Sequence, residues 1–231
     1  METTRKISIR LKLLFFICLF SISLQGQSKS SSFDNFYRED QFFLGSSYFI
    51  QNQSVQDFKQ NGFSGNFQIG FIRDIPINNN SSKAIGIGFG YERNFFTSNI
   101  QPVLEDDIIK YNVVVSRFLE SKNNFNYSSI SLPIEFRWRT STRDQYKFWR
   151  IYTGFKIKKN FAIYSNPSYG TELKISDIQD WTNSIYFIGG FNTWNLSLEY
   201  DLSPILKDKK TTNGENLDLS FLRLGLIFYL L

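Results

Sequence analysis

A two-residue alternation of apolar and polar side chains runs through the centre of the chain, from Ile130 to Lys159. Successive side chains of a β-strand point to opposite faces, so this pattern predicts two long strands, each with one apolar and one charged face. A short polar turn, Thr140 to Lys147, joins them. A soluble two-sheet protein buries its apolar face in a core, whereas a transmembrane barrel turns that face toward lipid and its polar face toward the lumen.

The same alternation recurs along the chain and predicts about eight strands. They are Phe42–Gln51, Phe63–Ile75, Ala84–Phe95, the two within Ile130–Lys159, Trp181–Phe191, Asn195–Leu206 and Leu217–Leu231. Longer polar connections alternate with short turns, which is typical of outer-membrane barrels with short periplasmic turns and longer outer loops. The sequence therefore predicts an all-β fold: an eight-stranded, up-and-down, antiparallel transmembrane β-barrel over residues 41–231, with short periplasmic turns and longer extracellular loops.

Two of the predicted outer loops are long and mixed in character, Phe96–Phe125 and Asn160–Asp180. The first holds the acidic run Glu105-Asp106-Asp107 and an apolar patch, Tyr111–Val115, that would extend a hairpin outward. Loops on a rigid scaffold are where binding sites concentrate, so any partner is expected at these two segments.

The first 26 residues have the three parts of a secretory signal peptide. A basic region from Arg5 to Lys12 precedes an apolar region from Leu13 to Leu24, and Gly26 ends a small-residue exit. The alternative is a membrane anchor, but the apolar run is shorter than the ~20 residues of a spanning helix. We expect cleavage near Gly26, a flexible tail over 27–40, and a mature chain without cysteine, because Cys18 is the only one.

Aromatic residues favour the membrane interpretation, because they are enriched at membrane interfaces. Those that fall at predicted periplasmic strand ends are Trp138, Trp149, Trp194, Phe228 and Tyr229. The alternative that stays open is a soluble, lipocalin-like barrel that binds an apolar ligand. On such a barrel the charged face would be an ordinary solvated surface, so the charges alone do not separate the two.

The composition excludes several kinds of chemistry. The sequence has no histidine, which removes the imidazole base of Ser-His or Asp-His hydrolases and acyltransferases. The formal charge is +5, but four basic residues against one acidic residue place +3 of it in the predicted signal, so a nucleic-acid partner is not expected. Glu105-Asp106-Asp107 lacks the spaced oxygen ligands of a calcium loop. We predict no catalytic residue, no cofactor and no metal.

A cluster of charges on the polar strand faces is the most distinctive polar feature. Its members are Glu135, Arg137, Arg139, Arg150, Lys156, Lys158, Glu199, Asp201 and Arg223. One interpretation is a lumenal or rim site for an anion such as a lipopolysaccharide phosphate. The other, which we favour, is an internal salt-bridge network that fills a narrow eight-stranded lumen.

The chain resembles the outer-membrane β-barrel proteins of Bacteroidota that are labelled PorT-like or porin-family proteins. The resemblance rests on the signal, the strands, the segments Arg137–Thr142 and Tyr146–Lys156, and the closing GLIFYLL. It implies an outer-membrane location and insertion by the barrel assembly machinery, for which an aromatic last strand is the signal. This chain ends in Leu231, with Phe228 and Tyr229 just before it.

Three functions follow for such a barrel. The first is a non-enzymatic outer-membrane protein, structural or partner-binding, in contact with lipid and with secretion-system or surface proteins. The second, implied by the resemblance to PorT, is a component of type IX protein secretion. The third is a small pore, which large lumenal side chains in an eight-stranded barrel disfavour.

Overall fold

The computed structural model describes residues 39–52, 55–115, 122–140, 148–168, 171–206 and 208–230. The predicted signal peptide and the predicted tail up to residue 38 lie outside this range. Within it, no helix has the length and hydropathy to cross a membrane.

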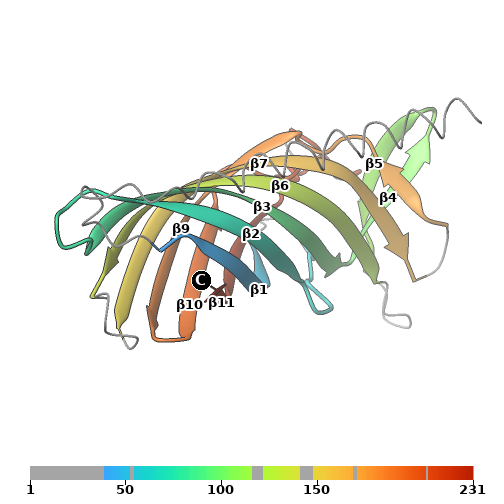
Figure 1. Cartoon of the computed structure of the whole chain (residues 1–231). Helices are drawn as coiled ribbons and strands as arrows, with labels where there is room; N and C mark the ends of the chain where they lie inside the picture. Colours follow the sequence, from blue (N-terminus) through green and yellow to red (C-terminus); the bar gives the residue numbers. More distant parts are fainter. Residues whose placement is uncertain are drawn as a thin grey trace, which may run out of the picture. The chain divides into compact units, whose positions relative to one another are not determined.

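Eight antiparallel strands pair side by side into a closed ring (Figure 1). They are β1 (Gln41–Asn52), β2 (Gly65–Pro76), β3 (Lys83–Ser98), β6 (Asn123–Arg139), β7 (Trp149–Pro167), β9 (Trp181–Phe191), β10 (Trp194–Asp201) and β11 (Ser220–Leu230). The ring runs β6-β3-β2-β1-β11-β10-β9-β7 and closes where β6 pairs with β7. The first and last barrel strands pair with each other as well. The predicted eight-stranded antiparallel barrel is confirmed.

Connection lengths differ between the two ends of the barrel. The longer connections are 53–64, 99–122, 168–180 and 202–219, and we call their side the long-loop end. The connections on the other side, the short-turn end, are 77–82, 140–148 and 192–193. The connection 99–122 contains a separate hairpin of β4 (Ile100–Glu105) and β5 (Ile108–Val113), and a short β8 (Leu173–Ile175) pairs with β7. Figure 1 shows this hairpin in light green at the end where β3 finishes.

The strands carry their apolar side chains outward and their charged side chains inward. On β6, Ile130, Leu132 and Ile134 are exposed, whereas Glu135 and Arg137 are buried. The same division holds around the ring, where Leu196 and Leu198 of β10 are exposed and the intervening side chains are buried. This is the polarity of a barrel in lipid and the reverse of a lipocalin-like barrel, whose interior would be apolar.

The polarity of the strands reverses near the long-loop end. At the start of β6, Phe125 and Tyr127 point inward and are buried, while Asn124 and Asn126 point outward. The predicted loop boundaries are therefore wrong: β6 begins at Asn123 rather than Ile130, and β7 continues to Pro167. Where a strand extends beyond the lipid, its outer face meets water, so apolar residues are no longer favoured on that face. The alternation of outward apolar and inward polar residues, from which the strands were predicted, therefore ends there.

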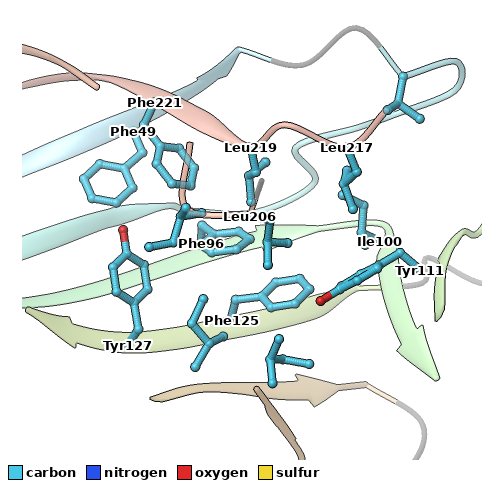
Figure 2. Close-up of a cluster of buried hydrophobic side chains, with 14 residues drawn as sticks. Phe49, Phe96, Ile100, Tyr111, Phe125, Tyr127, Leu206, Leu217, Leu219 and Phe221 are labelled. Carbon is cyan, nitrogen blue, oxygen red and sulfur yellow. The ribbon is translucent and has the colours of Figure 1, made fainter. Parts of the chain in front are cut away.

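The interior at the long-loop end is filled by apolar side chains, which we call the apolar plug (Figure 2). Phe96 of β3 stacks on Phe125 with ring centroids 4.5 Å apart, and lies 5.2 Å from Phe221 of β11. The plug also takes side chains from β1, from both hairpin strands and from the connection 202–219. These are Phe49, Ile100, Tyr111, Leu206, Leu217 and Leu219. Aromatic rings of this size bury large areas and tie the loops to the barrel wall.

Aromatic side chains gather on the outside of the short-turn end. Trp149 lies 5.1 Å from Phe191, and Trp194 lies 5.5 Å from Phe228, with both tryptophans exposed. Amphipathic rings are favoured where lipid meets water. The prediction was wrong for Tyr229, which faces the lumen and packs on Tyr152 at 5.7 Å, because it has the inward parity of its strand.

Candidate functional site

A first charged layer fills the lumen near the short-turn end. It contains three acids and three bases: Glu39, Asp74, Glu135, Arg137, Arg139 and Arg150. Both terminal nitrogens of Arg139 donate to the Asp74 carboxylate, at 2.9 and 2.8 Å. Two parallel bonds of this kind give an arginine–carboxylate pair both strength and a fixed orientation.

Arg137 connects the members of this layer to one another. Its Nε donates to Glu135 at 2.6 Å, and one Nη donates to Asp74 at 3.0 Å and to the Glu39 carbonyl at 3.2 Å. The guanidinium lies 4.9 Å from the Tyr152 ring centroid, a cation–π arrangement. Glu135 also accepts a hydrogen bond from the Tyr186 hydroxyl at 2.6 Å. The layer is thus bonded across the lumen.

Arg150 belongs to this layer by position but has different contacts. Its guanidinium lies 4.6 Å from the Phe148 ring centroid and 5.3 Å from that of Tyr229. It forms no ion pair within the described part of the chain. The structure therefore places this predicted member against aromatic rings rather than carboxylates.

A second charged layer lies at mid-lumen and is again made of three acids and three bases: Glu92, Glu199, Asp201, Lys156, Lys158 and Arg223. Lys156 lies 3.1 Å from Glu92 and 2.7 Å from Glu199. Lys158 lies 2.8 Å from both Glu199 and Asp201.

The last strand completes this second layer. Arg223 of β11 approaches Asp201 at 2.9 Å and Glu92 at 3.3 Å. The six charges come from β3, β7, β10 and β11, so strands distant in sequence meet here.

The two layers are each neutral, which decides what the lumen can do. A buried charge is tolerated when a group of opposite charge neutralises and hydrogen-bonds it. Eleven of the twelve charges, all except Arg150, have a partner of opposite charge among the described residues. A cavity of about 20 Å³ remains beside Glu135, Lys156 and Glu199, which is room for about one water molecule. Between the layers, the described side chains leave room for about one water molecule and none for a larger ligand.

Three members of the layers were missed from the sequence: Glu39, Asp74 and Glu92. Asp74 and Glu92 have the inward parity of their strands, and this signal was present in the alternation. Glu39 precedes β1 within the predicted tail, and its side chain is fully buried, with its N–H donating to Asp74 at 3.3 Å. Nothing in the sequence pattern places that residue inside the barrel.

The acidic run at 105–107 forms the turn of the β4–β5 hairpin. Asp106 and Asp107 have φ of 49° and 61°, the left-handed pair that a two-residue hairpin turn requires. Glu105 pairs with Lys110 at 2.7 Å across the hairpin. No group of histidine, cysteine, aspartate or glutamate side chains suited to a metal ion occurs in the described ranges.

The hairpin has one buried and one exposed side. Ile100 and Tyr111 lie in the apolar plug, and the Tyr111 carbonyl accepts a hydrogen bond from the Thr212 N–H at 3.0 Å. Burial, with a contribution from the Asp177 carboxylate, raises the pKa of the Tyr111 hydroxyl. On the opposite side Val103 and Ile108 are exposed, Ile108 by more than half.

Comparison with known sequences identifies the type of barrel. Residues 25–204, more than half of the chain, match the family described as "Outer membrane protein beta-barrel domain". The chain belongs to this family. The outer-membrane barrel family accounts for the outward apolar surface, and the protein is located in the outer membrane.

Among solved structures, the chain is similar to Ail, the attachment invasion locus protein of Yersinia pestis, solved in complex with the heparin analogue sucrose octasulfate. The identity is 11%, the TM-score is 0.32, and the alignment covers 83% of this chain and 99% of Ail. A search of curated proteins found no match.

Proposed function

We propose that this outer-membrane barrel is a non-enzymatic envelope protein that binds a protein partner through its β4–β5 hairpin. The observation that carries the proposal is the exposed apolar side of that hairpin. In outer-membrane barrels the long loops face the outside and the short turns face the periplasm. With this orientation the hairpin stands on the cell surface.

The filled lumen supports a binding role rather than transport. Two neutral charged layers and the apolar plug occupy successive levels of the interior. An ion would have to displace paired charges and then cross a dry apolar region, and both are costly. The non-enzymatic assignment is supported by the absence of histidine from the sequence, which removes the common general base.

The hairpin is suited to hold a partner because it combines anchorage with exposure. Ile100 and Tyr111 fix its inner side in the apolar plug, so the exposed side is held on a rigid support. Val103 and Ile108 lie on that exposed side as diagonal cross-strand neighbours, since Val103 pairs with Lys110 and Ile108 with Glu105, and they are exposed by 36% and 63%. Exposed apolar patches of this kind mark interaction sites on folded proteins, and a two-stranded ribbon also offers strand edges for pairing.

A second candidate is a PorT-like role in type IX protein secretion, with a secretion-system protein as the partner. It rests on the resemblance of the segments Arg137–Thr142 and Tyr146–Lys156, of which Arg137 and Arg139 lie in the first charged layer. Deletion of the gene, followed by a survey of secreted proteins and of gliding, separates this role from a general envelope role. Insertion by the barrel assembly machinery is expected for either, with Phe228 as the outward aromatic residue near the end of β11.

Site-specific photo-crosslinking in intact cells tests the proposal. A photoreactive amino acid at Ile108 should give a defined adduct, and the same residue at Asn79, in the turn 77–82 of the short-turn end, should not give that adduct. With the photoreactive residue at Ile108, the additional change Val103→Ser on the same face should weaken the adduct. Equal adducts at the two positions, or an adduct unaffected by Val103→Ser, would contradict binding through the hairpin.

A further inference from the structure

A basic side chain interrupts the lipid-facing surface on β3. Arg93 has outward parity and is exposed, next to Tyr91 on the same strand. One Nη of Arg93 donates to the Ser128 hydroxyl at 3.2 Å, and the Tyr91 and Ser128 hydroxyls lie 2.8 Å apart. Among the described residues Arg93 forms no ion pair. The lipid-facing surface thus holds a cation that is hydrogen-bonded to a hydroxyl group.

The depth of Arg93 in the membrane follows from the strand geometry. Lys83, the other outward cation of β3, precedes it by ten residues, or about 33 Å along the strand. A tilt of about 40° reduces this to about 25 Å, the height of the apolar band of an outer-membrane barrel. On neighbouring β6 the outward side chains change from Ile130 to Ser128 at this level. Both observations put Arg93 at the boundary between acyl chains and headgroups on the long-loop side.

A groove begins beside Arg93 and runs over the apolar surface. It has a volume of about 680 Å³, and its lining includes Tyr91 and Arg93. Its apolar walls are Leu44, Phe67, Ile69, Leu226 and Phe228.

The floor of the groove is low because the residues there are small. Ser46 pairs with Phe67 on one side and with Leu226 on the other, so a small side chain lies between two large ones. Gly225, another small residue of the lining, has the inward parity of Arg223 and adds no side chain to the outer surface. The groove is therefore built into the strand packing.

We propose that this surface binds one phosphate-bearing, acylated lipid of the outer leaflet, of the chemical class of lipid A. The phosphate would bind the Arg93 guanidinium, which suits phosphate oxygens. In the Tyr91–Ser128 hydroxyl pair one proton is used between the two, and the other is available to the phosphate. An acyl chain would lie in the groove over Ser46, where apolar walls contact it on both sides. Charge complementarity selects this occupant, because a neutral lipid leaves Arg93 without an anion.

Binding of purified lipid A to the full mature chain in detergent micelles, measured by native mass spectrometry, tests this site. Arg93→Gln should weaken binding by about tenfold or more, the effect of losing a hydrogen bond between charged groups. The matched control is Arg73→Gln, an outward arginine at the opposite end that pairs with Asp40 at 3.2 Å, and it should bind as the native protein does. Ser46→Leu fills the groove and should weaken binding as well. A mobility shift on boiling verifies that each variant is folded.

Each outcome bears directly on the proposal. Equal affinities of Arg93→Gln and the native protein would overturn it. Equal affinity for lipid A from which the phosphates have been removed would also overturn it. Displacement of lipid A by inorganic phosphate, together with unchanged binding by Ser46→Leu, would assign the site to a free anion and exclude the lipid.

Discussion

Replacement of Arg137 by methionine tests whether the first charged layer stabilises the barrel. Methionine keeps much of the side-chain volume but removes the charge and three hydrogen bonds, to Glu135, Asp74 and the Glu39 carbonyl. Within the described part of the chain Glu135 then keeps only the Tyr186 hydroxyl, and the layer carries one unbalanced negative charge.

The expected size of the effect follows from this loss. Removing one partner of a buried ion pair destabilises a protein by about 3–5 kcal/mol, because the remaining charge stays buried without compensation. With a urea slope of about 2 kcal/mol per molar, the unfolding midpoint should fall by about 2 M.

A second substitution separates charge balance from packing. Glu135→Gln added to Arg137→Met leaves two acids and two bases in the layer and preserves an acceptor for Tyr186. The double variant should recover about 1–3 kcal/mol relative to the sum of the single variants, the coupling of groups in contact. The matched surface control, Arg73→Met, breaks an exposed pair with Asp40 and should change the free energy of unfolding by less than about 1 kcal/mol.

Reversible urea unfolding of the barrel in lipid vesicles, followed by tryptophan fluorescence, measures these free energies. Native stability in Arg137→Met, or additive losses in the double variant, would refute the view that the layer is held by mutual neutralisation.

Three further predictions follow from other features. Phe96→Ala removes the ring that stacks on Phe125 at 4.5 Å, so the free energy of unfolding in the same urea assay should fall by about 3–5 kcal/mol, and a loss under about 1 kcal/mol would contradict a packed plug. Tyr111→Phe removes a buried hydroxyl that has no hydrogen-bond partner among the described residues, so it should not lower stability at neutral pH. Because the pKa of Tyr111 is raised in the folded state, the unfolded chain loses the hydroxyl proton first, so the free energy of unfolding is unaffected below the unfolded pKa of about 10 and falls as the pH rises above it. Tyr111→Phe should reduce this fall, measured as urea midpoints across the alkaline range. Identical pH profiles of the native protein and the variant would contradict a raised pKa at Tyr111. In planar bilayers the native protein should show no steady single-channel conductance, and regular ohmic steps would show that the lumen is open.

The fold could be predicted because lipid imposes a simple rule on each strand. Between Ile130 and Trp138 every outward residue is apolar or aromatic, and most outward residues of the other barrel strands follow the same rule, with exceptions such as Ser46, Arg73 and Thr153. The preference for outward apolar residues ends where the strand leaves the lipid. Residues 123–129 are strand, but their outward asparagine and serine side chains face water, so a pattern defined by lipid could not identify them. Strand β4 was missed because it lies outside the barrel sheet and its apolar residues Val103 and Leu104 are adjacent, so they do not alternate with polar ones.

The candidate site was predictable in kind but not in its pairing. Parity places Lys156, Lys158 and Glu199 on one face, yet parity alone does not say which charges share a level of the lumen. That depends on the register between strands, such as Glu92 opposite Ser129. The fully buried Glu39 shows the limit most clearly, because its position depends on contacts with β2 and β6 and not on any strand of its own.

The origin of the lumenal charges has a consequence for how the barrel assembles. Arg223 lies on the last strand, and its carboxylate partners lie on β3 and β10, so it stays without them until β11 has joined the sheet. Before that event the face that will become the interior carries charges that are incompletely neutralised, because Arg223 is missing from the layer. Transfer of such charges into a membrane is strongly unfavourable. Closure and neutralisation are therefore one event. An intermediate that lacks one strand is therefore destabilised in the membrane twice, by unneutralised lumenal charges and by the unpaired backbone groups of its open sheet edges.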